Sequence, residues 1–155
     1  FNHIGPGQRV DFIIPSIAVA IVKIKLGIRN SIIELGNIDV TRDFTDVRDL
    51  VRAYLSLLTD GENGEIYNVC SGQDVRIRDM ITKMSDIAGV QLEIVHDPAR
   101  YRPSDQKHVR GSCAKILAAT GWQPQIPIEQ SLRNILSDWE TRERLALSGS
   151  HQTES

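Results

Sequence analysis

Apolar residues recur along this chain at helical spacing in long segments and as short apolar runs between them. Residues 13–26 are mostly apolar, with Pro15 in the expected first turn and Gly27 just past the end. This pattern predicts a helix that is buried on most faces. Residues 47–58 repeat apolar side chains at helical spacing, and Asp46 stands directly before them as a good N-cap. A second helix is therefore expected there.

Three further helices follow from the same reasoning. Residues 77–88 place their apolar side chains on one face and stop at Gly89, which predicts a helix whose methionines pack in a core. Ser112 is expected to cap a short helix through Ala119, and a last helix is expected from Ile128 to about residue 147. The short apolar segments between the helices predict strands at residues 31–35, 39–44, 65–69 and 91–95.

This alternation of strands and helices predicts an α/β fold. Neither an internal repeat nor a linker interrupts it, so residues 1–147 are expected to fold together, with a disordered polar tail at 148–155. The longest connection is the polar segment 96–111, and a connection of that length inside a compact domain is a candidate functional loop.

Composition narrows the possible classes of protein. The chain has 155 residues, 41% hydrophobic and 25% charged, which is typical of a globular protein. A net charge of −2 disfavours nucleic-acid binding.

The uninterrupted apolar run from Ile17 to Val22 is too short to span a bilayer, so no membrane association is expected. Cys70 and Cys113 form no C-x-x-C pair, which favours a reducing cytoplasmic setting.

Several chemical motifs are excluded or unsupported. The glycines of Gly5-Pro6-Gly7 lack the third glycine of a dinucleotide-binding loop, so this segment is interpreted as a turn. The four histidines have no metal-ligand spacing, and a metal site is not expected. No G-x-S-x-G sequence supports a serine nucleophile.

Two arginines are candidates for binding phosphate. Arg42 lies near the end of a predicted strand, and Arg102 lies on the long loop, where Pro103 favours an extended backbone. A guanidinium group donates paired hydrogen bonds to phosphate oxygens, and the carboxylate of Asp105 can accept hydrogen bonds from ribose hydroxyls. From pattern alone, a solvated surface arginine is the more common explanation for each of these positions.

A resemblance to a known family favours the phosphate-binding role for these two arginines. The segments FNHIGPGQ, LGNIDVTRDFTDVRDLVRAY, EIYNVCSG, RPSD and AATGWQPQIPIEQSL occur in this order. Together they resemble the C-terminal half of the extended short-chain dehydrogenases that act on nucleotide sugars. The chain is most similar to the GDP-4-keto-6-deoxy-D-mannose reductases and next to the GDP-mannose 4,6-dehydratases, which carry a lysine where this chain has Ser16.

The resemblance implies an α/β fold made of the last Rossmann strands and helices, interleaved with a small substrate-binding subdomain, over residues 1–147. It also implies a role for each site residue. The expected substrate-binding residues are Asn2, Ile13, Ser16, Arg42, Arg102 and Asp105, with both arginines on the diphosphate and Asp105 on the ribose. Phe1 and His3 are expected to lie beside the cofactor.

The implied activity is NADPH-dependent (or NADH-dependent) reduction of GDP-4-keto-6-deoxy-D-mannose to GDP-D-rhamnose by a cytoplasmic homodimer. In this family the Gly-rich loop and the catalytic Tyr-x-x-x-Lys pair belong to the N-terminal half. Tyr54, Tyr67 and Tyr101 are not followed by lysine at the fourth position, so this chain is expected to contribute no catalytic residue. Phe1 is accordingly interpreted as an internal position of a longer protein, in which the N-terminal half binds most of the cofactor.

Three alternatives stay open at this point. In the first alternative, the parent enzyme is a GDP-mannose 4,6-dehydratase or another nucleotide-sugar epimerase or dehydratase. Alternatively, the chain is a nucleotide-binding module without catalytic activity. In the third alternative it is an unstable fragment with exposed apolar surface, in which the segment Ile13–Val22 promotes self-association.

Overall fold

The computed structural model describes residues 1–100 and 106–150. Along the chain the elements are β1 (Asn2–Ile4), α1 (Ile13–Lys25), β2 (Ile32–Leu35), β3 (Thr41–Asp46), α2 (Val47–Asp60), β4 (Asp74–Arg76), α3 (Ile77–Ala88), β5 (Glu93–His96), the 3₁₀ helix η1 (Pro98–Arg100), α4 (Ala114–Thr120) and α5 (Ile128–Ser150). This alternation confirms the predicted α/β class. Among the described residues, no helix is long and apolar enough to cross a membrane.

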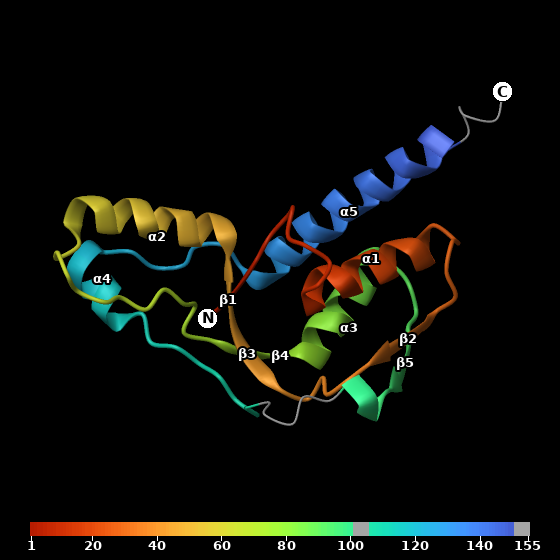
Figure 1. Ribbon diagram of the computed structural model, residues 1–155, viewed down its shortest axis with the longest axis horizontal. Coiled ribbons are helices and arrows are strands. Elements are labelled where there is room, and N and C mark those ends of the chain that lie inside the picture. Colours follow the sequence, from red (N-terminus) through yellow and green to blue (C-terminus); the bar gives the residue numbers. More distant parts are fainter. Residues whose placement is uncertain (101–105, 151–155) are drawn as a thin grey trace.

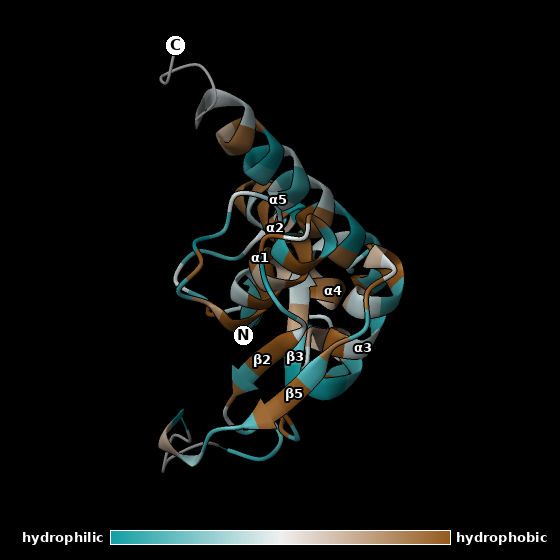
Figure 2. Ribbon diagram, turned by 90° about the vertical axis from the view of Figure 1, so that its right-hand side faces the viewer, coloured by the Kyte–Doolittle hydropathy of each residue, from teal (hydrophilic) through white to brown (hydrophobic). Residues whose placement is uncertain are grey.

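The strands form two small sheets (Figure 1). In the first, β3 is central, with β1 parallel to it on one side and β4 antiparallel on the other. In the second, β2 and β5 pair in parallel. Figure 2 shows these two largely hydrophobic strands side by side. The register of the first sheet sets Asn2 opposite Phe44, which brings the start of the chain to the middle of β3.

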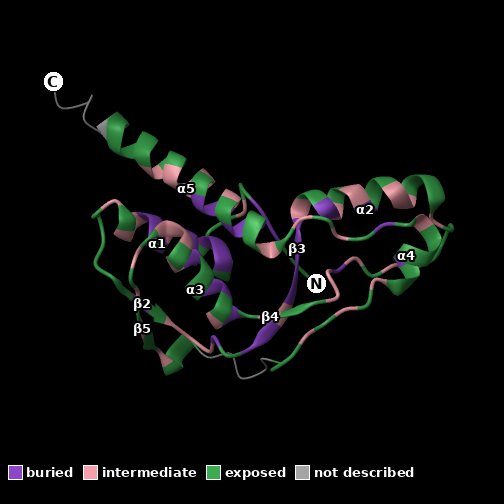
Figure 3. Cartoon of the chain, turned by 180° about the vertical axis from the view of Figure 1, so that it is seen from behind, coloured by how far each residue is buried: buried purple, intermediate pink, exposed green. Residues whose placement is uncertain are grey.

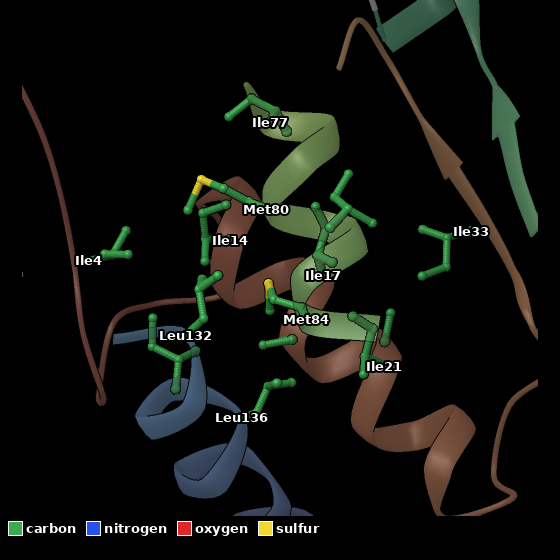
Figure 4. Close-up of a cluster of buried hydrophobic side chains, with 14 of the residues drawn as sticks. Ile4, Ile14, Ile17, Ile21, Ile33, Ile77, Met80, Met84, Leu132 and Leu136 are labelled. Carbon is green, nitrogen blue, oxygen red and sulfur yellow. The ribbon is translucent and has the colours of Figure 1, made fainter. Parts of the chain in front are cut away.

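The main core lies between α1, α3 and α5 (Figure 4). Met80 and Met84 of α3 are fully buried, as the apolar face of this helix predicts. Ile17 and Ile21 of α1 are also inaccessible to solvent. The segment from Ile13 to Val22 is therefore mostly core in the folded chain.

Helix α2 begins where the sequence indicates, since Asp46 is its N-cap and accepts a hydrogen bond from the Arg48 backbone N–H. Its larger apolar side chains are not buried, however. The most exposed of them are Val51, Tyr54, Leu55 and Leu58. Figure 3 shows most of this helix as exposed or half-buried. The opposite face packs inward through Asp49 and Ala53, because Asp49 accepts backbone hydrogen bonds from residues 125 and 126.

Four details differ from the sequence expectations. Residues 65–69, predicted as a buried strand, form an extended loop in which Ile66 is 84% exposed, because no described strand pairs with them. Helix α4 is capped at Cys113 and not at Ser112. Helix α5 continues to Ser150, so the first three residues of the predicted disordered tail are helical. The short strand β4 was not predicted.

A buried carboxylate holds the central strand to two distant loops. Asp43 of β3 is fully buried, and its Oδ1 accepts hydrogen bonds from the backbone and hydroxyl of Ser71 at 2.8 and 2.6 Å. Its Oδ2 accepts from the backbone N–H groups of Gly72 at 3.0 Å and Gly111 at 3.1 Å. Asp43 therefore fixes the position of β3 between these two loops.

The N-cap of α2 should make stability depend on pH. Burial opposes ionisation of Asp46, but hydrogen bonds from Arg48 and from the Ser131 hydroxyl outweigh burial and lower the pKa of Asp46. A carboxyl group whose pKa is lower in the folded state stabilises the fold above its unfolded pKa, and this contribution is lost as the pH falls.

We therefore expect Asp46→Asn, which retains an N-cap, to be less stable than the wild type at neutral pH. The difference should shrink as the pH falls below about 4, the usual pKa of an unfolded aspartate, and through the lower pKa of the folded state. Urea denaturation of both proteins between pH 7 and pH 3 measures this. A difference that stays constant over that range would contradict the assignment.

Candidate functional site

Three segments position the predicted site residues. Pairing with β3 fixes Asn2, whose side-chain Nδ2 donates a hydrogen bond to the Asp43 carbonyl oxygen at 3.3 Å. Ile13 and Ser16 lie in the first turns of α1, which begins directly after Phe12. Arg42 lies on β3, two residues from Phe44, so both side chains are on the same face of the strand.

These residues meet at one cavity of about 370 Å³. Asn2, Ile13, Ser16 and Arg42 all line it, together with Phe44 on the floor provided by β3. The remaining wall comes from β2 and the turn after it. There Gly36 is required, because a Cβ on this residue would lie 2.6 Å from the Arg100 carbonyl oxygen. The cavity thus combines apolar walls with polar groups from distant parts of the chain, as ligand sites commonly do.

Arg42 is held at the edge of this cavity by backbone acceptors. Its guanidinium Nη1 donates to the carbonyl oxygens of Thr41 at 2.8 Å and Gln106 at 2.7 Å. The side chain therefore has a defined direction before any ligand binds. Arg102 and Asp105 lie outside the described residues, and the roles expected for them stay predictions.

Two carboxylates that the sequence analysis did not single out also line the larger cavity. Asp11 pairs with Arg9 at 2.5 Å, and Glu34 of β2 pairs with Arg100 at 3.5 Å. Each carboxylate has a basic partner, so neither leaves an isolated negative charge beside a bound anion. Their positions depend on how β2 and the segment before α1 come together, which no local pattern in the sequence indicates.

A second cavity of about 170 Å³ adjoins the first. Phe1 and His3, the residues expected beside a cofactor, both line it. The two cavities share four residues, Asn2, Phe12, Ile13 and Phe44. All six described residues of the predicted site therefore lie at two adjoining cavities, although only the resemblance and not a local motif placed them together.

The described residues offer few other groups for chemistry. Burial raises the pKa of the Cys70 thiol to about 11, with a smaller contribution from nearby Asp43. Because the thiolate is the reactive form, Cys70 is unsuited to act as a nucleophile at neutral pH. Within residues 1–100 and 106–150, no group of three or more His, Cys, Asp or Glu side chains is arranged to hold a metal ion.

Comparison with known proteins identifies the family to which the chain belongs. Residues 1–135 match the family described as GDP-mannose 4,6 dehydratase. The chain therefore belongs to this family of nucleotide-sugar short-chain dehydrogenases, and it corresponds to the C-terminal portion of their Rossmann-type fold.

Within the family, the chain is 56% identical over 144 residues to GDP-6-deoxy-D-mannose reductase of Pseudomonas aeruginosa. That match covers 93% of the chain and 47% of the reductase. A solved structure of RMD from the same organism, complexed with NADPH, superposes with a TM-score of 0.87 at 55% identity, over 92% of this chain and 47% of that one.

A GDP-6-deoxy-D-talose 4-dehydrogenase of Aggregatibacter actinomycetemcomitans is 30% identical over 78% of the chain and 40% of that protein. The chain spans about half the length of the curated relatives it matches. These comparisons confirm the family and the α/β fold expected from the sequence.

Proposed function

We propose that this chain forms the substrate-binding half of an NADPH-dependent reductase that converts GDP-4-keto-6-deoxy-D-mannose to GDP-D-rhamnose. The observation that carries the proposal is the meeting of Asn2, Ile13, Ser16 and Arg42 at one cavity. The 56% identity to a GDP-6-deoxy-D-mannose reductase supports the choice of substrate.

The residues of the larger cavity suit a nucleotide sugar. The guanidinium group of Arg42 is suited to donate charge-assisted hydrogen bonds to the diphosphate. The amide of Asn2, fixed on Asp43, lies where the two cavities meet and is proposed to orient the sugar. Phe12 and Phe44 line both cavities and provide apolar surface in the same region. Holding the reacting groups in a productive geometry is the contribution expected of this half.

The smaller cavity suits the nicotinamide end of a cofactor, because apolar side chains and three polar residues line it. When bound, NADPH supplies the hydride that converts the C4 ketone to an alcohol, and the resulting oxygen takes up a proton. In the proposal, the tyrosine that gives this proton lies in the part of the relatives that this chain does not span. His3 and Phe1 contribute walls of the cofactor cavity.

The test is a calorimetric titration of the chain with GDP. We expect binding, and we expect Arg42→Ala to weaken it about tenfold or more, because a charge-assisted hydrogen bond contributes about 1.5–3 kcal/mol. The affinity of Arg42→Lys for GDP should lie between those of the wild type and Arg42→Ala, since lysine retains the charge but not the paired donors. Arg144→Ala, an exposed substitution on α5, is the control and should bind like the wild type. Equal affinities for wild type and Arg42→Ala would overturn the proposal.

A dehydratase is the second candidate, because the matching family carries that description. Dehydration of GDP-mannose involves no net consumption of NADPH, whereas the reduction oxidises one NADPH per sugar. Measured NADPH consumption by an enzyme that contains this half separates the two activities.

A further inference from the structure

The segment formed by residues 106–111 runs beside the first residues of β3 (Figure 1). The Thr41 backbone N–H donates a hydrogen bond to the Lys107 carbonyl oxygen at 2.9 Å, and the Val109 N–H donates to the Thr41 carbonyl oxygen at 3.3 Å. Residues 106–108 are exposed, so water competes for these bonds. Exposed backbone pairing of this kind opens readily, and it holds the segment only weakly by itself.

A pair of side chains adds a second connection between the segment and β3. The Thr41 hydroxyl oxygen lies 3.0 Å from Nδ1 of His108, which is hydrogen-bond distance. The same hydroxyl is 3.4 Å from the Asp74 carboxylate, which is long for a bond between two oxygens, so His108 is its nearer partner. Thr41 is only 9% exposed. Valine is also β-branched and suits a strand equally well, so strand formation does not explain the hydroxyl at this position.

The 106–111 segment also supplies one of the two acceptors that direct Arg42. The guanidinium Nη1 donates to the Gln106 carbonyl oxygen at 2.7 Å and to the Thr41 carbonyl oxygen at 2.8 Å. Gln106 is two residues from His108, so the position of its carbonyl oxygen depends on how firmly the segment rests on β3. An arginine side chain has many rotamers, and the loss of this freedom opposes binding unless it is already restricted.

From these contacts we propose that Thr41 and His108 are positioning residues for Arg42. Their hydrogen bond fixes the 106–111 segment on β3, and the Gln106 carbonyl oxygen then holds the Arg42 guanidinium group at the edge of the larger cavity. Neither Thr41 nor His108 is among the described residues that line the two cavities, so both act through Arg42. The inference rests on the proposed function, which supplies the ligand, but the order of Arg42 is measurable without one.

The first measurement is the mobility of the Arg42 side chain in the chain without ligand. Its ¹⁵Nε relaxation reports order on the picosecond to nanosecond timescale, and we expect an order parameter of about 0.8 in the wild type. The value should fall below about 0.6 in Thr41→Val and in His108→Leu, which each remove one partner of the hydrogen bond. Thr41→Ser retains the hydroxyl group and should retain the order of Arg42.

The second measurement is the affinity for GDP by calorimetry. Thr41→Val and His108→Leu should each weaken binding about threefold to tenfold, the effect of losing one hydrogen bond. In a chain that already carries Arg42→Ala, neither substitution should weaken binding further, because both act through that arginine. Thr41→Ser should bind GDP like the wild type. His96→Leu is the matched control, because His96 is exposed at the end of β5, and it should also bind like the wild type.

The inference would be overturned if Arg42 stayed ordered in both Thr41→Val and His108→Leu. It would also be overturned if these substitutions weakened GDP binding equally with and without Arg42, since the pair would then support the fold in general. If the wild type failed to bind GDP while the order of Arg42 still depended on the pair, the proposed substrate would be wrong and the positioning role would remain. If GDP bound through Arg42 and loss of the pair changed neither order nor affinity, only the proposed function would stand.

Discussion

Asp43→Ala is expected to destabilise the protein by about 3–5 kcal/mol, because it leaves several buried donors without an acceptor. The carboxylate receives hydrogen bonds from Ser71, Gly72 and Gly111. The two loops that carry these donors are 28 and 68 residues away in the sequence. Loss of the acceptor should therefore loosen both loops from β3 at once. Urea denaturation followed by circular dichroism measures the change in the free energy of unfolding.

Asp39→Ala provides a matched control. Asp39 precedes β3 and forms an exposed ion pair with Arg78 at 2.8 Å. Exposed pairs contribute little because water competes for both partners. The unfolding midpoint of this variant should stay close to that of the wild type. If Asp43→Ala shifted the midpoint no more than Asp39→Ala does, the hydrogen bonds to Asp43 would not hold the loops as described.

Leu132→Ala is expected to cost about 2–5 kcal/mol, the range for buried large-to-small substitutions that leave a cavity. Leu132 is fully buried on α5 and lies in the core near Ile14 and Met84 (Figure 4). Because this core joins α5 to both α1 and α3, the surrounding side chains cannot collapse easily into the space. The measurement is again the free energy of unfolding in urea.

The same helix offers the control for this substitution. Leu145 lies on α5 and is 66% exposed, so Leu145→Ala removes the same atoms without opening a cavity. We expect its effect to stay within about 0.5 kcal/mol of zero. Similar losses for the two variants would show that core packing does not determine the effect of Leu132→Ala, since alanine has at least the helix propensity of leucine.

The helices were predictable because their signals are local. Asp46 caps α2 through its own side chain, and Gly89 ends α3 in a left-handed conformation that favours glycine. What a helix face contacts is not a local property, however. The spacing of apolar residues in α2 indicated a helix correctly, yet it did not reveal that Asp49 and Ala53 form the buried face.

Strands were less predictable because a strand also needs a partner. Residues 65–69 have suitable side chains, but no described strand pairs with them. β4 has only three residues, and it is a strand because of its antiparallel pairing with β3. A short segment with a partner therefore forms a strand, while a more apolar one without a partner remains a loop.

The site was predicted from a resemblance, and the structure shows why pattern alone was insufficient. Asn2 and Arg42 are 40 residues apart and come together only through the parallel pairing of β1 with β3. Gln8, Glu34 and Phe44 were missed, since whether a side chain faces a cavity depends on the tertiary arrangement. The alternation along β3 could have indicated Phe44, which lies two residues from Arg42.

The pairing of β1 with β3 also determines the order in which the protein can assemble. The helices form from contacts within a few residues, but β1 joins its sheet only after residues 5–40 have folded back as a closed loop. Closing a long loop before its contacts form makes such pairing a slow step. Both cavities have Asn2 in their walls, so neither exists before that step. Ligand binding should therefore appear late in refolding, after most of the helical signal has been recovered.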